Sequence, residues 1–153
     1  MRTVIQRVRQ ADVTVNNETV GSIGYGYVLL TGFTHDDDDQ NVKEMAKKIV
    51  ELRICEDENQ KMNLSLKDIN GEILSISQFT LYADARKGRR PSFIEAARPE
   101  QATALYDLLN RELESYGFKV ETGIFQADMK VSLVNDGPVT IILDSQDIVK
   151  SHR

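Results

Sequence analysis

A change in the spacing of the apolar residues near residue 40 constrains the fold of this chain more than any other feature. Up to residue 33 the apolar residues alternate or form short runs between glycines, a pattern typical of strands. The expected strands cover residues 4–8, 13–15, 20–23 and 25–33, with a turn at Asn16-Asn17. Over residues 40–51 the apolar residues instead recur every three or four positions, which predicts a helix with Asp39 as its N-cap.

The second half of the chain returns to strands after one more helix. Pro99 is a favourable first residue for this helix, and Gly117 ends it. The other expected strands cover residues 52–55, 72–82, 120–125, 131–135 and 139–143, with Asn70-Gly71 as a hairpin signal and residues 83–98 as a loop. About eight strands and two main helices that do not alternate regularly predict an α+β fold with mostly antiparallel, barrel-like β-sheets. We find no repeat or linker and therefore expect a single domain over residues 1–153.

The composition argues against several classes of function. The chain carries 19 Lys and Arg against 24 Asp and Glu, a net charge of −5, which excludes a uniformly basic surface but leaves room for a local basic patch. One cysteine excludes an internal disulfide, and the two histidines, His35 and His152, leave little material for a histidine-based triad or metal site. No apolar run reaches the ~18–20 residues of a membrane helix, and the N-terminus turns polar too early for a signal peptide. We therefore expect a cytoplasmic protein that does not bind a membrane.

Four consecutive aspartates at residues 36–39 are a candidate site for a divalent cation. An EF-hand loop needs glycine at its sixth position and glutamate at its twelfth. Counted from Asp36, those positions hold Asn41 and Lys47. The run is better explained as a solvated acidic loop that caps the following helix, so we expect no metal and no cofactor.

The segment Arg86-Lys87-Gly88-Arg89-Arg90 is the densest basic stretch of an otherwise acidic chain. Guanidinium groups fit phosphate oxygens, so Arg86, Lys87, Arg89 and Arg90 are candidates for contact with an RNA backbone. Taken alone, the segment is better explained as an ordinary solvated loop.

Polar residues also gather in the segment Ser77-Gln78-Phe79-Thr80-Leu81. If it continues the preceding strand, Gln78 and Thr80 point to one side, at the end of a row that begins apolar. Thr80 can act as a nucleophile only if a base activates it, and no such base lies nearby in the sequence. A later segment, Asn135-Asp136-Gly137-Pro138-Val139-Thr140, is most simply a turn between two strands.

These two segments together resemble a known family. The first resembles the SQFTL signature of the D-aminoacyl-tRNA deacylases, and the second resembles their NxGPVT signature. The length, the start of the chain and the Arg-rich loop ending in Pro91-Ser92-Phe93 are similar to the family as well.

The resemblance implies both an activity and a site. Members of the family hydrolyse the ester between a D-amino acid, or glycine, and the terminal adenosine of tRNA, spare L-aminoacyl-tRNA, and act as homodimers. The bond that corresponds to Gly137-Pro138 is cis in the family and reaches into the partner's site, where its carbonyls face the α-carbon of the substrate. The resemblance therefore makes Arg7 a candidate to brace this element across the interface. It implies that Ser77, Gln78, Phe79 and Thr80 line the wall of the site opposite the Gly137-Pro138 element. It also makes Phe125 and Met129 candidates for the pocket of the terminal adenine.

The implied chemistry suits a chain poor in histidine and cysteine. An ester to a ribose hydroxyl is already activated, and its hydrolysis needs a placed water and donors for the oxyanion, which backbone N–H groups can supply. The resemblance also implies that the 2′-hydroxyl of the tRNA replaces a side-chain base. The leading hypothesis is thus a tRNA-directed esterase. The alternatives are a non-catalytic RNA-binding module using residues 86–90 and a metal-dependent hydrolase built on residues 36–39.

Overall fold

The computed structural model describes residues 1–151, with side chains up to Ile148, and His152 lies outside the described residues. Five strands are neighbours in the order β2 (Glu18–Ile23), β1 (Arg2–Val15), β3 (Gly26–Gly32), β6 (Glu72–Ser77) and β7 (Val120–Thr122), and β8 (Lys130–Asp144) also pairs with β1. β1 pairs antiparallel with β2, β3 and β8. β6 pairs parallel with both β3 and β7. The predicted α+β fold with mostly antiparallel pairing is confirmed, and the sheet is mixed.

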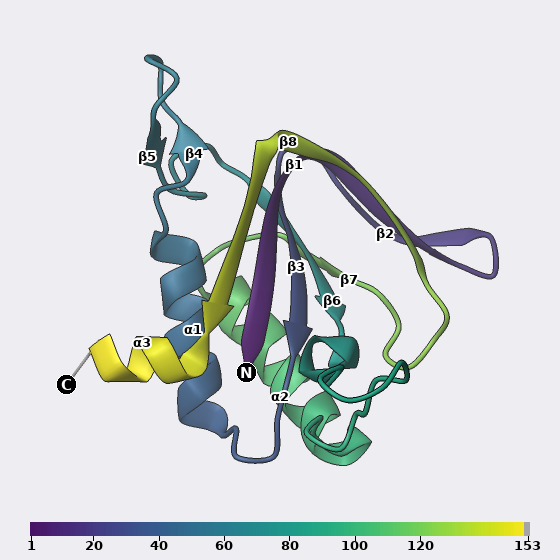
Figure 1. Ribbon diagram of the computed structural model, residues 1–153. Coiled ribbons are helices and arrows are strands. Elements are labelled where there is room, and N and C mark those ends of the chain that lie inside the picture. Colours follow the sequence, from purple (N-terminus) through teal and green to yellow (C-terminus); the bar gives the residue numbers. More distant parts are fainter. Residues whose placement is uncertain (152–153) are drawn as a thin grey trace.

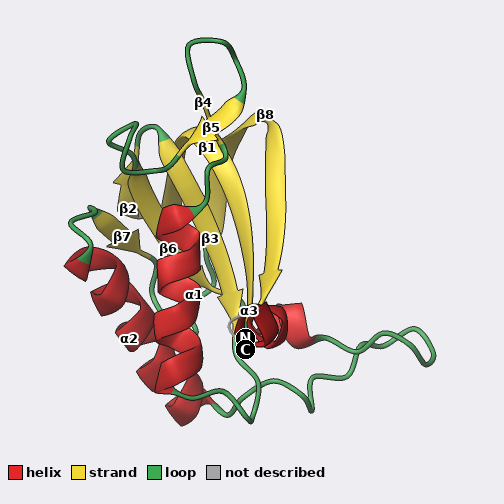
Figure 2. Ribbon diagram, turned by 90° about the vertical axis from the view of Figure 1, so that its left-hand side faces the viewer, coloured by secondary structure: helices red, strands yellow, loops and turns green. Residues whose placement is uncertain are grey.

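The sheet curves into a nearly closed barrel that is covered by helices on one side. β2 approaches β7 so closely that a Cβ on Gly21 would lie 2.9 Å from the carbonyl oxygen of Thr122. α1 (Asp39–Glu51) and α2 (Pro99–Ser115) run side by side against one face of the sheet (Figures 1 and 2). A third, unpredicted helix, α3 (Ser145–Ser151), follows β8 directly. No helix within residues 1–151 is both long enough and apolar enough to span a membrane.

Two groups of buried side chains form the core. The larger lies between the helices and the sheet and includes Tyr27, Leu29, Met45, Ile49, Leu109 and Leu113. The smaller is formed by strand residues alone, among them Val8, Val13, Val28, Leu74 and Ile76. Burial of these apolar side chains is the main force that holds the helices and the curved sheet together.

The acidic run caps α1, as predicted, but the N-cap is Asp38 and not Asp39. The Asp38 side chain accepts a hydrogen bond from the N–H of Asn41 at 3.0 Å, and the Asn41 side chain accepts one from the N–H of Asp38 at 2.9 Å. This reciprocal pair is a capping box, and it places Asp39 as the first residue of the helix.

The strand predicted over residues 72–82 ends earlier than expected. β6 stops at Ser77, and residues Phe79–Tyr82 form a short 3-10 helix, η1. The alternation assumed for Gln78 and Thr80 is therefore wrong. The hairpin expected at Asn70-Gly71 is wrong as well, because β5 (Met62–Leu64) pairs with β4 (Cys55–Glu56) whereas β6 pairs with β3 and β7. Two other strands are displaced or shortened, since β4 starts at Cys55 and β7 ends at Thr122.

β8 is one strand where two strands and a turn were expected. Its pairing with β1 shifts register between Gln6, opposite Thr140, and Val8, opposite Asn135. Residues 136–139 thus bulge out opposite the single residue Arg7. The Asn135 side-chain amide closes the bulge by donating to the carbonyls of Arg7 and Val139 at 2.9 and 3.0 Å.

Candidate functional site

A cavity of about 750 Å³ opens beside the end of β6 and the start of α2. Five residues singled out in the sequence line it: Ser77, Gln78, Phe79, Phe125 and Met129. The first three come from the end of β6 and the start of η1, whereas the other two come from the segment between β7 and β8. The fold therefore brings residues 77–79, here called the SQFTL-like wall, and the two candidate adenine-pocket residues into one cavity.

Backbone hydrogen bonds hold the SQFTL-like wall in place. The N–H of Gln78 donates to the carbonyl of Thr31 at 2.8 Å, which ties the end of β6 to β3. The chain then turns into η1, whose first N–H groups, on Phe79 and Thr80, have no acceptor within the helix because they open it. Such N–H groups are suitable donors for a developing oxyanion.

Thr80 is exposed and is not among the residues that line the cavity. Its hydroxyl accepts a hydrogen bond from the side-chain amide of Gln78. Among the side chains that the structure describes, no carboxylate or imidazole hydrogen-bonds to this hydroxyl. The geometry gives Thr80 no activating base and suits a positioning role.

Aromatic residues form the apolar part of the cavity. The rings of Phe79 and Phe93 meet edge to face with centroids 5.2 Å apart, and Phe125 stacks on Tyr106 at 6.3 Å. Tyr106 is itself fixed by a hydrogen bond from its hydroxyl to the carbonyl of Ser75 at 2.7 Å. A planar apolar group such as a purine ring fits walls of this kind.

Gly137 and Pro138 lie elsewhere in the protomer, at the bulge of β8. Their peptide bond is cis, both residues are exposed, and Gly137 has a φ of +121°. Arg7 on β1 and Ser77 on β6 belong to the same sheet and both have a partner on β3. Arg7 pairs with Tyr27, whereas Ser77 pairs with Thr31, four residues further along. That offset corresponds to about 13 Å along the strand. Within one chain the bulge beside Arg7 is therefore separated from the end of β6 at the cavity by four residues along β3.

Arg7 is buried beneath the bulge of its own chain. Its Nη1 donates to the carbonyl of Ile54 at 2.7 Å, its Nη2 lies 3.2 Å from Glu56 Oε1, and its Nε lies 3.4 Å from Asp136 Oδ2. A Cβ on Gly137 would lie 3.1 Å from Arg7 Nη2. Arg7 thus supports the backbone of residues 136–139 from below in the same protomer.

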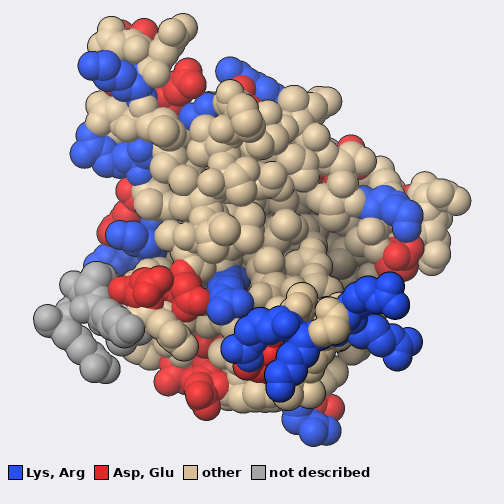
Figure 3. Space-filling model, viewed as in Figure 1, with Lys and Arg blue, Asp and Glu red and all other residues tan. Residues whose placement is uncertain are grey.

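The basic segment lies on the exposed loop between η1 and α2. Arg86, Lys87, Arg89 and Arg90 are all exposed, and Figure 3 shows a group of Lys and Arg side chains over this part of the surface. Arg86 forms a two-pronged pair with Asp84, with Nη2 2.8 Å from Oδ2. The hydrogen bonds from Arg86 lower the pKa of Asp84 to about 2. The loop therefore presents positive charge at the side of the molecule where the cavity opens.

Several lining residues were not identified from the sequence as site residues. They are Gly32, Phe33, Ile76, Phe93, Ala96, Ala97, Arg98, Pro99, Ala102, Gln126, Ala127, Asp128 and Val131. Most are small or apolar, and they contribute shape and backbone atoms. Apart from Phe93, which ends the Arg-rich loop that resembles the family, no motif in the sequence points to these residues.

The acidic run serves the fold. Asp38 caps α1, and Asp37 binds the N-terminal amine and the N–H of Thr34. No cluster of three or more potential metal-ligating side chains occurs within the described part of the chain.

The sequence is similar to one known protein family over nearly its whole length. The sequence model of the D-Tyr-tRNA(Tyr) deacylase family matches residues 4–144. A D-aminoacyl-tRNA deacylase of Halalkalibacterium halodurans is 58% identical over 146 residues, which cover 95% of this chain and 100% of the relative. A D-aminoacyl-tRNA deacylase of Lactobacillus acidophilus is 59% identical over 144 residues, 94% of this chain and 99% of the relative.

Two solved structures share the fold. The c-Myc DNA unwinding element binding protein has a TM-score of 0.88 and 39% identity, over 94% of this chain and 98% of that one. A probable eukaryotic D-amino acid tRNA deacylase has a TM-score of 0.81 and 19% identity, over 93% of this chain and 97% of that one. At that identity, the second match concerns the fold alone.

Proposed function

The chain belongs to the D-Tyr-tRNA(Tyr) deacylase family and is a D-aminoacyl-tRNA deacylase, and from this premise we propose how its site works. The proposed reaction cleaves the ester between the terminal adenosine of tRNA and a D-amino acid or glycine, in a cytoplasmic homodimer. The observation that carries the proposal is the meeting of the 77–79 segment with Phe125 and Met129 in one cavity. One side offers backbone donors for the ester and the other offers apolar surface for the adenine.

Hydrolysis in this site uses the backbone in place of a charged side chain. A water attacks the ester carbonyl, and the N–H groups of Phe79 and Thr80 stabilise the oxyanion that forms. The C–O bond to the ribose then breaks, and the ribose oxygen takes up the proton that the attacking water loses. The neighbouring 2′-hydroxyl of the tRNA orients the water, which accounts for a site without a side-chain base.

Rejection of L-aminoacyl-tRNA is assigned to Gly137 and Pro138 of the partner subunit. Both residues are exposed on a bulge that lies far from the cavity of their own chain. Two apolar side chains of β8, Val134 and Ile142, are 49% and 70% exposed, which supports a second copy packed against this strand. A backbone wall supported by the buried Arg7 leaves no room on one side of the α-carbon, because main-chain atoms cannot swing aside. Arg7 of each chain thus supports the bulge of that same chain, and through the bulge it fixes the wall that is presented to the partner's site.

The tRNA backbone is proposed to follow the basic loop. Arg86, Lys87, Arg89 and Arg90 are exposed, and the same loop continues into Phe93 at the cavity. Such contacts predict an affinity for tRNA that falls with rising salt concentration. Ser77 and Gln78 complete the wall that faces the amino acid.

A single assay tests the proposal. The purified protein is incubated with D-Tyr-tRNA, L-Tyr-tRNA and Gly-tRNA, each with and without a chelator, and release of the amino acid is measured. We expect release from the D and glycyl substrates, no release from the L substrate, and no effect of the chelator. Equal release from the D and L substrates contradicts the stereochemical filter, and loss of activity with the chelator indicates a metal-dependent hydrolase. Retention of tRNA without release indicates the non-catalytic RNA-binding alternative.

A further inference from the structure

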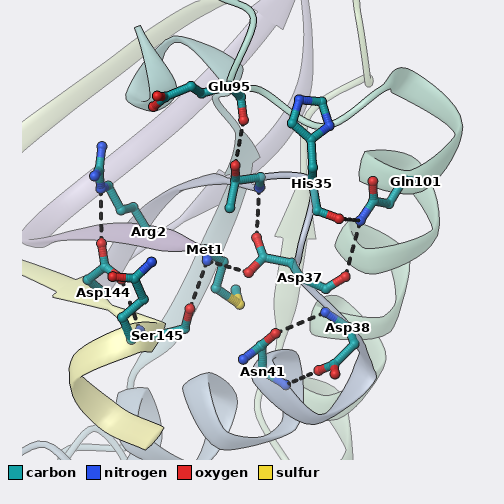
Figure 4. A network of polar contacts seen from close by, with 12 residues as sticks. Met1, Arg2, His35, Asp37, Asp38, Asn41, Glu95, Gln101, Asp144 and Ser145 are labelled. Carbon is teal, nitrogen blue, oxygen red and sulfur yellow. Dashed lines mark hydrogen bonds and ion pairs between the residues drawn. The ribbon is translucent and has the colours of Figure 1, made fainter. Parts of the chain in front are cut away.

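The turn that follows β3 is anchored by a buried carboxylate. Asp37 Oδ1 accepts a hydrogen bond from the N-terminal amine of Met1 at 2.6 Å, and its Oδ2 accepts one from the N–H of Thr34 at 2.7 Å. The Asp37 side chain is 5% exposed and the side chain of Met1 is fully buried. The amine also donates to Ser145 Oγ at 2.8 Å, so that the start of β1, the turn and α3 meet at one point (Figure 4).

The same turn holds a segment of the cavity wall that belongs to no helix or long strand. Thr34 Oγ1 donates to the carbonyl of Glu95 at 2.5 Å, and the N–H of Ala97 donates to the carbonyl of Phe33 at 2.9 Å. Thr34 and Ala96 also form an isolated antiparallel bridge. The wall segment at residues 93–97 is therefore attached to the body of the protein largely through residues 33–35.

Two more contacts lock this arrangement from its outer side. His35 Nε2 donates to the carbonyl of Ile94 at 2.6 Å. Gln101, on the first turn of α2, donates from Nε2 to the carbonyls of His35 and Asp37 at 3.0 and 3.1 Å (Figure 4). The turn is thereby tied both to the wall segment and to α2, which also lines the cavity.

We infer that Asp37 is a positioning residue for the substrate cavity, acting through Thr34 on the wall formed by Phe93, Ala96, Ala97 and Arg98. The inference rests on the proposed function, because it assigns this wall to substrate binding. The wall meets the 77–80 segment at the ring contact of Phe93 with Phe79, whereas its hydrogen bonds go to Phe33 and Thr34 in the turn after β3. Loss of the Asp37 carboxylate therefore weakens binding of the substrate and leaves the chemical step nearly intact.

The kinetic test compares four variants with D-Tyr-tRNA as substrate, at a temperature well below the melting temperature of each. Asp37→Ala removes the anchor, and Thr34→Val removes only the hydroxyl that reaches Glu95. Thr34→Ser keeps that hydroxyl, and Asp36→Ala changes an exposed neighbour in the same acidic run. We expect KM to rise about tenfold in the first two variants with kcat changed less than about threefold, and to stay unchanged in the other two.

A second measurement does not depend on catalysis. In hydrogen exchange, the N–H of Ala97, which is bonded to Phe33, should exchange faster in Asp37→Ala and Thr34→Val. The N–H of Gln78, which ties the end of β6 to the carbonyl of Thr31 on β3, should keep its rate and serves as the internal control. If the wild-type protein released no D-tyrosine, the proposed function would fail while the exchange result still tested the link from Asp37 to the wall.

The inference is overturned if Asp37→Ala and Thr34→Val are folded and keep the wild-type KM. It is also overturned if exchange at the N–H groups of Ala97 and Gln78 accelerates by the same factor in these variants, because an equal acceleration indicates a general loss of stability. If Thr34→Ser raised KM as much as Thr34→Val does, the Thr34 hydroxyl would have no role in substrate binding.

Discussion

At the scale of single residues, Thr80 presents its hydroxyl to solvent and to the amide of Gln78, and no carboxylate or imidazole in the described part of the chain hydrogen-bonds to it. We expect Thr80→Ala to slow deacylation of D-Tyr-tRNA by less than about 10³-fold, because the variant keeps the N–H that faces the oxyanion and loses only the hydroxyl. Thr80→Ser should retain most of the activity. A loss of about 10⁴-fold or more in a folded Thr80→Ala protein would instead assign Thr80 as the nucleophile.

Gly137 has no space for a side chain and an unfavourable backbone conformation for one. A Cβ there would lie 2.8 Å from Val139 Cγ2 and 3.1 Å from Arg7 Nη2, and φ is +121°. We expect Gly137→Ala to displace residues 136–139, and therefore to lose either activity on D-Tyr-tRNA or discrimination against L-Tyr-tRNA.

The matched control for that substitution is Gly117→Ala. Gly117 also has a positive φ, +95°, but nothing lies within 4 Å of its added Cβ. It stands just after α2, so its replacement should lower stability through backbone strain and leave both rates unchanged. Unchanged D and L rates in Gly137→Ala would contradict the assignment of Gly137 to the stereochemical filter.

At the scale of elements, the start of α1 distinguishes two neighbouring aspartates. Asp38 forms the capping box with Asn41, whereas Asp39 is the first helical residue. We expect Asp38→Ala to destabilise the protein by about 1 kcal/mol, because an N–H of the first turn loses its acceptor. Asp39→Ala should cost less, about 0.3–1 kcal/mol, through its interaction with the helix dipole. Thermal unfolding of both variants measures the difference, and a larger loss for Asp39→Ala would contradict the assigned cap.

Elements with a long regular pattern could be predicted from the sequence, and irregular ones could not. The stripe from Val42 to Val50 and the Pro99 start predicted α1 and α2 because helix periodicity and capping are local properties. The parallel pairing of β6 with β3 depends on contacts between distant segments, so Asn70-Gly71 was misread as a hairpin. The end of β6 at Ser77 has no local signal either, since Phe79–Tyr82 is as compatible with a strand as with a 3-10 helix.

In the candidate site, too, residues within a sequence motif could be predicted, and residues placed by the fold alone could not. The residues Ser77, Gln78, Phe79, Phe125 and Met129 came from the family resemblance, and the structure brings them to one cavity. Residues such as Ala96 and Ala97 line that cavity with small side chains and backbone, which no motif records. The bulge opposite Arg7 was equally hidden, because a shift of register between two strands leaves no mark in either strand alone.

At the scale of the whole molecule, the separation of bulge and cavity makes the proposed site a product of two subunits. Ser77→Phe fills the cavity wall and Gly137→Phe destroys the bulge, so each homodimer should be inactive. Refolding the two chains together should restore about a quarter of the wild-type activity, because half of randomly assorted dimers are mixed and each mixed dimer holds one intact site. No recovery in mixed dimers of confirmed composition would show that Gly137 does not act across the interface.

The pairing of β1 with β8 also determines when this chain can fold in the cell. β1 ends at Val15, whereas β8 begins only at Lys130 and pairs along nearly the whole of β1. A ribosome takes roughly ten seconds to synthesise the residues between them. During that time one edge of β1 has no strand to pair with, and an open edge invites pairing with other chains. β1 therefore completes its pairing only late in synthesis, and until β8 is available its open edge can pair with other chains.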